Sequence, residues 1–250
     1  MTRCNCRIGF SRLRAVATGV AAALLAGCAT RADLGSAPGG QTVRAAAPVT
    51  VVHRADMLWL ERVSFGLDSA TVADYRRLGR QAFLDRQLHP RDVTLPAPIA
   101  AEIAALEVTH ADPVRWLADV EAQHKLINAM PDGPEKEQAR RALNDRGNRL
   151  AYEATRRDLL RAVYSPAQLQ EQMVWFWLNH FSVFQFKANL RWLVGDYEER
   201  AIRPHALGHF KELVLATLEH PAMQQYLDNN HNAAGHVNEN YARELMELHT

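Results

Sequence analysis

The chain has 250 residues, of which 48% are hydrophobic and 23% are charged, and its formal net charge at pH 7 is +1. This composition is that of an ordinary globular protein and excludes collagen-like, coiled-coil and wholly disordered chains. The near-neutral charge argues against a dedicated nucleic-acid binder, so no nucleic-acid partner is expected.

The first segment, residues 1–27, has the pattern of a bacterial lipoprotein signal. Four arginines and no acidic residue accompany a short apolar run at Ala15–Ala26, as in secretory signals. Leu25-Ala26-Gly27-Cys28 then resembles the lipobox at which the lipoprotein signal peptidase cuts, leaving Cys28 as an acylated N-terminus. Several acyl chains, at about 0.8 kcal/mol per buried CH₂, hold a protein firmly on a bilayer. The alternative is a signal that is neither cleaved nor lipidated, with an incidental cysteine.

Cleavage would change the location and the charge of the chain. Ala29 follows the cysteine; in Gram-negative lipoproteins an aspartate there commonly retains the protein at the inner membrane. We therefore expect an exported protein anchored in the outer membrane and facing the periplasm. Loss of four arginines lowers the net charge from +1 to about −3. Residues 28–52, rich in Gly, Ala, Pro, Ser and Thr, are expected to form a flexible tether.

The remainder, residues 53–250, shows helical periodicity throughout, and the predicted fold class is all-α, an irregular multi-helix domain. Asp112 before Pro113 is typical of an N-cap and an N1 proline, and Thr71–Asp74 resembles a capping box. Phe184–Phe186 is the one weak strand candidate. Helices are predicted over residues 55–63, 71–78, 81–88, 99–107, 113–127, 135–163, 166–181, 203–218, 221–227 and 237–249.

Two of these helices carry specific expectations. Gly147 is a candidate break in the long charged helix 135–163. The segment Met173–Phe181 is dense with Trp and Phe. A helix that is apolar on all sides is deeply buried. We expect the Trp and Phe cluster at residues 175–186 to form core, with a carbohydrate-stacking platform as the alternative.

Four stretches carry a resemblance to a known family. They are WLERVSFG at Trp59–Gly66, LLRAVYSPAQLQEQMVWFWLNHFSVF, RWLVGDYEERAIRPHALGHFKELVLATLEHPAMQQYLDN and NENYARELMELHT. In them the sequence resembles the bacterial DUF1800 family, a domain of unknown function. The resemblance implies an envelope partner, because members are commonly secreted and often encoded beside a second secreted family. Members are also commonly about twice as long and continue past ELHT, so the chain is expected to be an N-terminal fragment, with a helical domain incomplete at its C-terminus.

The polar C-terminal motif is the first candidate site. On a regular helix Tyr241, Leu245 and Leu248 would form the buried stripe, with Glu244 and His249 at its edge. Carboxylate, amide and imidazole groups gathered there could carry out acid–base chemistry or bind a hard divalent metal. The alternative is a capped surface helix in which Arg243 pairs with both Glu239 and Glu247. Candidate catalytic residues are Glu239, Glu244 and His249, and candidate binding residues are Asp228, Asn238, Asn240, Arg243 and Glu247.

Histidines elsewhere form a second set of candidates. Asn179-His180 follows the aromatic run. His180 is a catalytic candidate and Asn179 is a binding candidate. The alternative is that His180 is a histidine at the edge of the core, bonded to a backbone carbonyl. Arg203 and His205 are further binding candidates. His205 and His209 lie four residues apart, a spacing that can hold one metal on a helix. No HExxH motif accompanies that pair.

Two functions remain open from the sequence. The first is a cell-envelope lipoprotein that acts as a helical scaffold or binding protein with an envelope partner. The second is an envelope hydrolase or metal-dependent enzyme that uses the C-terminal Glu, His and Asn residues. The chain has no Gly-rich phosphate loop, GxSxG elbow or CxxCH haem motif. The sequence therefore does not decide whether the protein is an enzyme, and a divalent metal is the one cofactor that it suggests.

Overall fold

The computed structural model describes residues 52–91, 93–110 and 112–249. These residues form helices and turns without a β-strand, apart from a single bridge between Ala233 and His236. The predicted all-α class is therefore confirmed. The predicted signal peptide, and the tether up to residue 51, lie outside the described residues. Within the described ranges, no helix is long and apolar enough to span a membrane.

The first two helices are α1 (Arg54–Leu60) and α2 (Ser69–Leu88). The carboxylate of Asp68 caps α2 by accepting the backbone N–H groups of residues 70 and 71 at 2.7 and 2.9 Å. The capping box predicted at Thr71–Asp74 is therefore wrong, because the cap lies three residues earlier. Gly79, with φ of 75°, kinks α2 at the boundary predicted between two helical segments.

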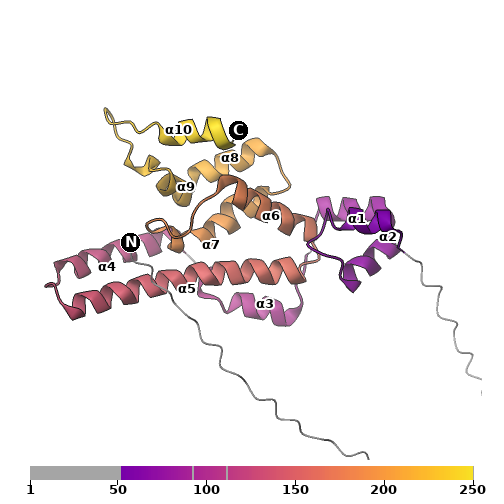
Figure 1. The fold of residues 1–250 in the computed structure, drawn as a ribbon, viewed down its shortest axis with the longest axis horizontal. Helices are drawn as coiled ribbons and strands as arrows, with labels where there is room; N and C mark the ends of the chain where they lie inside the picture. The colour runs from indigo at the N-terminus through magenta and orange to yellow at the C-terminus, as the bar shows by residue number, and fades with distance from the viewer. Residues whose placement is uncertain (1–51, 92, 111, 250) are drawn as a thin grey trace, which may run out of the picture. The chain divides into compact units, whose positions relative to one another are not determined.

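The next elements are α3 (Ala97–Ala104), the short turn η1 (Glu107–His110), α4 (Pro113–Ala129) and α5 (Pro134–Tyr164). As predicted, Asp112 caps α4, accepting N–H bonds from the second and third residues of the helix at 3.1 Å. Helices α4 and α5 run side by side in opposite directions (Figure 1). The long α5 also contacts α3, η1 and α6, so it is the element against which much of the fold packs.

Gly147 does not interrupt α5, contrary to the expectation of a break. A Cβ at this position would lie 2.3 Å from Cδ of Arg191 and 3.0 Å from Nε1 of Trp192. The glycine is thus needed for close approach of the turn η2 (Leu190–Trp192) to α5. A glycine inside a helix lowers the helix stability by about 1 kcal/mol relative to Ala. The close packing of Trp192 offsets this loss.

Helix α6 (Gln168–Phe181) is only partly buried. Val174 and Phe181 face the core, whereas Trp175 is 63% exposed and Phe176 is 48% exposed. The prediction of a helix buried on all sides is therefore wrong for one face. That face adjoins the groove described below.

The C-terminal third consists of short elements, joined by short turns except for a longer loop at residues 232–239. The helix predicted from Arg203 begins as a tight turn, and α8 starts only at Phe210. Two turns, η3 and η6, have the wide π-helical geometry. The elements are α7 (Val194–Asp196), η3 (Tyr197–Ile202), η4 (Arg203–His205), α8 (Phe210–Glu219), α9 (Pro221–Tyr226), η5 (Asn229–His231), α10 (Asn240–Glu244) and η6 (Leu245–His249).

Candidate functional site

The structure brings together two of the predicted catalytic histidines. His180 on α6 contacts the backbone oxygen of His249 through Nε2 at 3.1 Å, and the two rings lie 5.7 Å apart between centroids. His249 is buried, and its Nδ1 has no hydrogen-bond partner among the described residues. Burial is the main cause that lowers the pKa of His249, and the electrostatic effect of neighbouring His180 is the second. His180 thus bonds a backbone carbonyl, as the structural alternative for it proposed.

The π-helical turn explains why His249, and not Leu248, faces the core. Tyr241 is buried and Leu245 is partly buried, but Leu248 is 64% exposed. A π turn holds more residues than an α turn, so the buried stripe steps from Leu245 to His249. The predicted stripe through Leu248 is therefore wrong.

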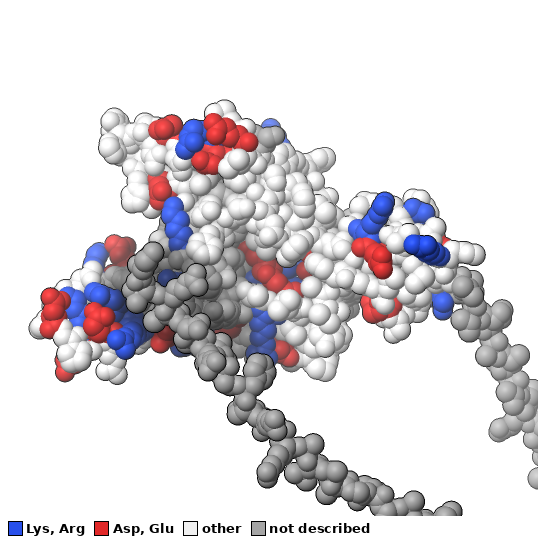
Figure 2. Space-filling view, viewed as in Figure 1, with Lys and Arg blue, Asp and Glu red and all other residues white. Residues whose placement is uncertain are grey.

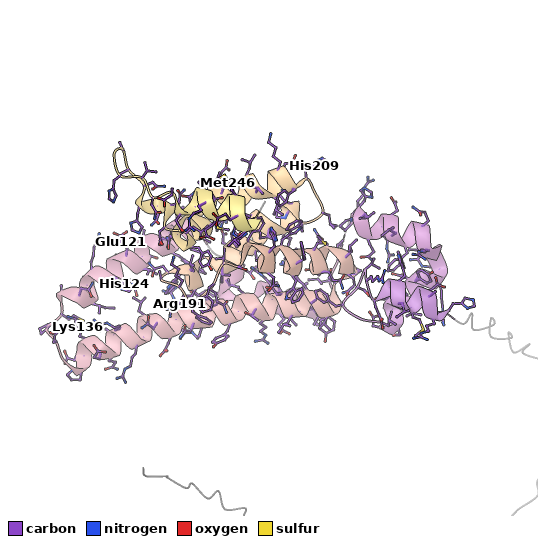
Figure 3. All side chains as sticks on the ribbon, turned by 45° about the horizontal axis from the view of Figure 1, so that its top comes forward. Glu121, His124, Lys136, Arg191, His209 and Met246 are labelled. Atoms are coloured by element: carbon purple, nitrogen blue, oxygen red, sulfur yellow. The ribbon has the colours of Figure 1, made fainter. Side chains whose placement is uncertain are left out.

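The other charged residues of this motif point toward one another at the surface. Arg243 pairs with Glu244 at 3.3 Å and with Glu247 at 3.9 Å. Glu239 is exposed, and in the described part of the chain no ion pair joins it to Arg243, contrary to the alternative predicted for this helix. Asn240 accepts a bond from Arg243, and the side chain of Asn238 caps the N–H of Asn240. This arrangement is mainly that of a solvated helix terminus; Met246 beside it is 71% exposed (Figure 3).

The remaining predicted residues are dispersed. Asn179 donates to the backbone oxygen of Trp175 at 2.7 Å, and Asp228 pairs with Lys187 at 3.3 Å. His205 ends the turn η4, whereas His209 is the N-cap of α8 (Figure 3), so the two do not share a helix face. No group of three or more His, Cys, Asp or Glu side chains that could hold a metal occurs among the described residues.

A buried Asp–His pair lies elsewhere, at Asp196 and His220. Nε2 of His220 contacts Oδ2 of Asp196 at 2.9 Å, and Nδ1 accepts the N–H of Ala222 at 3.1 Å. Because Nδ1 is an acceptor, the ring proton is on Nε2 and is donated to the carboxylate. Both nitrogens are occupied, so this pair orients α9 and is not free for proton transfer.

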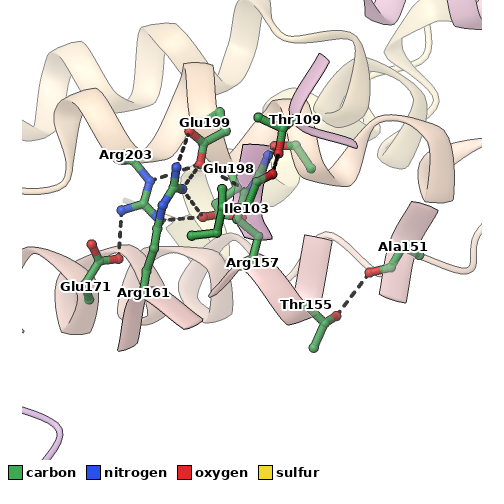
Figure 4. A network of polar contacts seen from close by, with 11 residues as sticks. Ile103, Thr109, Ala151, Thr155, Arg157, Arg161, Glu171, Glu198, Glu199 and Arg203 are labelled. Atoms are coloured by element: carbon green, nitrogen blue, oxygen red, sulfur yellow. Dashed lines mark hydrogen bonds and ion pairs between the residues drawn. The ribbon is translucent and has the colours of Figure 1, made fainter. Parts of the chain in front are cut away.

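The strongest concentration of buried charge is a set of six side chains that we call the charge cluster (Figure 4). Arg203 donates to Glu171 at 2.7 Å and to Glu198 at 2.6 Å. It also contacts Glu199, through Nε at 3.1 Å. The members are Arg157 and Arg161 on α5, Glu171 on α6, Glu198 and Glu199 on η3, and Arg203 on η4.

Two arginines of α5 complete the charge cluster. Arg157, only 1% exposed, donates to the backbone oxygen of Gly195 at 2.6 Å and to Glu198 at 3.2 Å. Arg161 donates to Glu199 at 3.1 Å. The π-helical turn η3 carries both glutamates, which contact the same pair of α5 arginines. Buried charges are tolerated only when they are paired in this way.

Asp158 adds a seventh group to this region and changes its charge balance. With Asp158 there are four carboxyl groups for three guanidinium groups, so one negative charge has no partner. Burial and the neighbouring charge of Glu198 raise the pKa of Asp158 far above its usual range. Although burial alone would raise it, the bond from Asp158 and the charges of Arg203 and Arg157 hold the pKa of Glu198 low. These opposite shifts mean that the pair of Asp158 and Glu198 holds one proton.

A groove of about 430 Å³ lies between α5 and α6, directly against the charge cluster. Its walls are mostly apolar, and Leu159 and Trp175 at the groove are 61% and 63% exposed. Oδ1 of Asp158 is shielded from solvent and has no partner in the described structure. The lining residues are Phe65, Thr155, Asp158, Leu159, Ala162, Val163, Glu171, Val174, Trp175, Leu178 and Arg203.

The polar residues of the groove offer acceptors rather than donors. Thr155 uses its hydroxyl proton on the backbone oxygen of Ala151, and each nitrogen of the Arg203 fork contacts a glutamate. Two carboxyl groups, Asp158 and Glu171, remain as oxygen acceptors at the groove. Elsewhere, on the face drawn in Figure 2, basic and acidic side chains of α4 and α5 are interspersed rather than gathered by sign.

Sequence reasoning singled out Arg203 but missed the other members of the charge cluster. One signal could have found Arg157. The buried positions of α5 follow a helical repeat through Leu150 and Ala154 to Arg157, so an arginine falls where the pattern calls for an apolar residue. No comparable pattern marks Glu198 and Glu199, because their placement depends on the π turn.

Comparison with known proteins gives a family but no activity. The family model described as "Protein of unknown function (DUF1800)" matches residues 58–250. No curated protein and no solved structure matches the chain. The matched range contains the charge cluster, the groove and the histidine pair. The chain therefore belongs to the DUF1800 family.

Proposed function

We propose that this chain is a cell-envelope lipoprotein that acts as a binding protein, and that the groove between α5 and α6 holds a small, largely apolar ligand. The observation that carries the proposal is a groove of about 430 Å³ whose apolar walls meet the carboxyl groups of Asp158 and Glu171. Sites for small molecules typically have volumes of about 300–1,000 Å³, apolar walls and a few polar groups that orient the ligand.

The exposure of the groove supports this proposal. Leu159, Val163 and Trp175 are 61%, 66% and 63% exposed and belong to one continuous lining. Contiguous apolar surface is unfavourable in water, and in natural proteins it commonly marks an interaction site. A ligand with an apolar body would cover these side chains and contribute about 25 cal/mol per Å² of buried apolar surface.

Binding is favoured over the enzyme alternative by the chemistry of the two candidate sites. The unpartnered Nδ1 of buried His249 is the feature that would suit catalysis, with Glu244 as a neighbouring charge. However, Glu244 is paired with Arg243, and the pair His180–His249 lacks a third ligand-type residue among those described. A hydrolase or metal-dependent enzyme would need both a reacting group and its activator in reach, whereas the groove needs neither.

The anchor proposed for this function is the acylated Cys28 in the outer membrane, with residues 28–52 as a tether facing the periplasm and an envelope protein as partner. The support is the Leu-Ala-Gly-Cys sequence at residues 25–28 and the family to which the chain belongs. In cells fed a tagged palmitate, we expect label in the wild type and none in Cys28→Ser. Equal labelling of both proteins would refute the anchor without bearing on the groove.

The groove itself is tested by filling it. Ala162 lines the groove, and Ala162→Trp would place an indole where the ligand lies. We expect the wild type to bind the neutral dye N-phenyl-1-naphthylamine saturably, and Ala162→Trp to weaken binding at least about tenfold, or about 1.4 kcal/mol.

The matched control is Val114→Trp, at a position 72% exposed on α4 and outside the groove. It adds the same surface indole without occupying the site, so dye affinity should match that of the wild type. Equal weakening by both variants, or no weakening by Ala162→Trp, would exclude the groove as the binding site.

A further inference from the structure

The charge cluster and the adjoining groove together contain one more carboxyl group than guanidinium groups. Arg157, Arg161 and Arg203 face Glu171, Glu198 and Glu199, and these six charges cancel. Asp158 is the one carboxyl group left over, and it lies where the charge cluster meets the groove. At present its charge is neutralised by a proton that it shares with Glu198.

The groups around Asp158 leave a cation as the natural replacement for that proton. From its own helix α5 it faces Arg157, from η3 it faces Glu198, from η4 it faces Arg203, and Glu171 on α6 lines the same groove. Both guanidinium groups already contact glutamates. An anionic ligand would therefore meet two carboxyl groups and no unpaired cation, which is unfavourable in an apolar site.

We propose that the ligand of the groove is an aliphatic amine, whose chain lies along the apolar walls and whose ammonium group takes the place of the Asp158 proton. This inference rests on the proposed binding function. The exchange is balanced: the ammonium enters with one positive charge, Asp158 ionises, and one proton leaves to solvent. An alkyl ammonium has a pKa like that of Lys, about 10.4, so it is charged throughout the neutral range.

The number of protons released per ligand bound can be measured. Because one proton is released for each ammonium bound, affinity should increase about tenfold for each unit of rising pH while Asp158 remains protonated in the free protein. The heat of binding should also depend on the ionisation heat of the buffer, with a slope of one proton. Neither signature is expected for a neutral ligand of the same length.

The experiment compares 1-decylamine, 1-decanol and decanoate, below their aggregation concentrations, with the full chain by isothermal titration calorimetry in two buffers. We expect decylamine to bind at least about tenfold more tightly than decanol at pH 8, with release of one proton. Decanoate should bind most weakly. In Asp158→Asn the preference for decylamine over decanol should fall to near one, whereas Asp145→Asn, an exposed carboxyl on the same helix, should keep the preference.

Each outcome decides a different claim. If decylamine binds no more tightly than decanol, or binds without releasing a proton, the amine proposal is overturned while the groove remains a binding site. If decanoate binds most tightly, the charge argument is wrong. If none of the three ligands binds and the naphthylamine dye does not bind either, the proposed function fails as well. Cooperative urea unfolding of Asp158→Asn shows that a lost preference does not come from a lost fold.

Discussion

Replacing Arg203 by Met is expected to lower the free energy of unfolding by about 3–5 kcal/mol, because it leaves buried carboxylates without their partner. Arg203 is the only residue whose guanidinium contacts all three glutamates of the charge cluster in the structure described. Methionine fills a similar volume, so the loss is mainly electrostatic. Urea unfolding of the full chain at neutral pH, followed by far-ultraviolet circular dichroism, measures the change.

The matched control is Arg140→Met on the exposed side of α5. Arg140 pairs with Glu137 at 2.9 Å, with both side chains about half exposed, and pairs of this kind contribute only about 0–1 kcal/mol. A loss in Arg203→Met no greater than that in Arg140→Met would show that the charge cluster is not a structural centre of the fold.

Because Asp158 and Glu198 hold one proton in the folded state, we expect the free energy of unfolding to fall as the pH rises from 5 to 8. In the unfolded chain Asp and Glu have pKa values of about 3.9 and 4.3, so both are charged above pH 5. The folded pair of Asp158 and Glu198 keeps one proton, because the pKa of Asp158 is raised and that of Glu198 is lowered. The folded state therefore binds one proton more than the unfolded state, and this pair alone lowers the free energy of unfolding by about 1.4 kcal/mol per pH unit. The loss ends where folded Asp158 ionises.

Asp158→Asn isolates this contribution. The amide is neutral at every pH and can still donate to Glu198, so the variant should be more stable than the wild type at pH 7. Its advantage, from urea unfolding at pH 5, 6, 7 and 8, should grow by up to about 1.4 kcal/mol per unit. Asp145→Asn, exposed on α5, should change stability by no more than about 0.5 kcal/mol. A constant difference between Asp158→Asn and the wild type would mean that Asp158 is ionised in the folded protein.

Local signals in the sequence were sufficient for much of the fold. Caps and proline positions depend on only a few neighbouring residues, so the start of α4 at Pro113 after Asp112 could be predicted. The extent of α5, Pro134–Tyr164, is close to the predicted 135–163, although a break was expected at Gly147. The break in α2 at Gly79 was likewise visible as a gap between two periodic segments.

Tertiary contacts decided what the sequence could not show. A glycine within a helical pattern predicts a break. Gly147 instead lies inside α5, where Arg191 and Trp192, more than forty residues away in the chain, leave no room for a Cβ atom. An aromatic helix reads as core, but one face of α6 lines the groove. The sequence also did not locate the charge cluster. The π-helical turn η3 shifts the helical register and places its glutamates against the arginines of α5.

The most direct test of the binding site is the fluorescence of Trp175, which lines the groove, during titration with N-phenyl-1-naphthylamine. The wild type should show saturable energy transfer from tryptophan to the bound dye. Trp175→Phe keeps an aromatic ring in the groove, so the dye should still bind, and the transfer should fall by the share that Trp175 contributes while the other four tryptophans keep theirs. Transfer that is equally strong in Trp175→Phe and in the wild type would place the dye elsewhere and contradict the assignment of the groove.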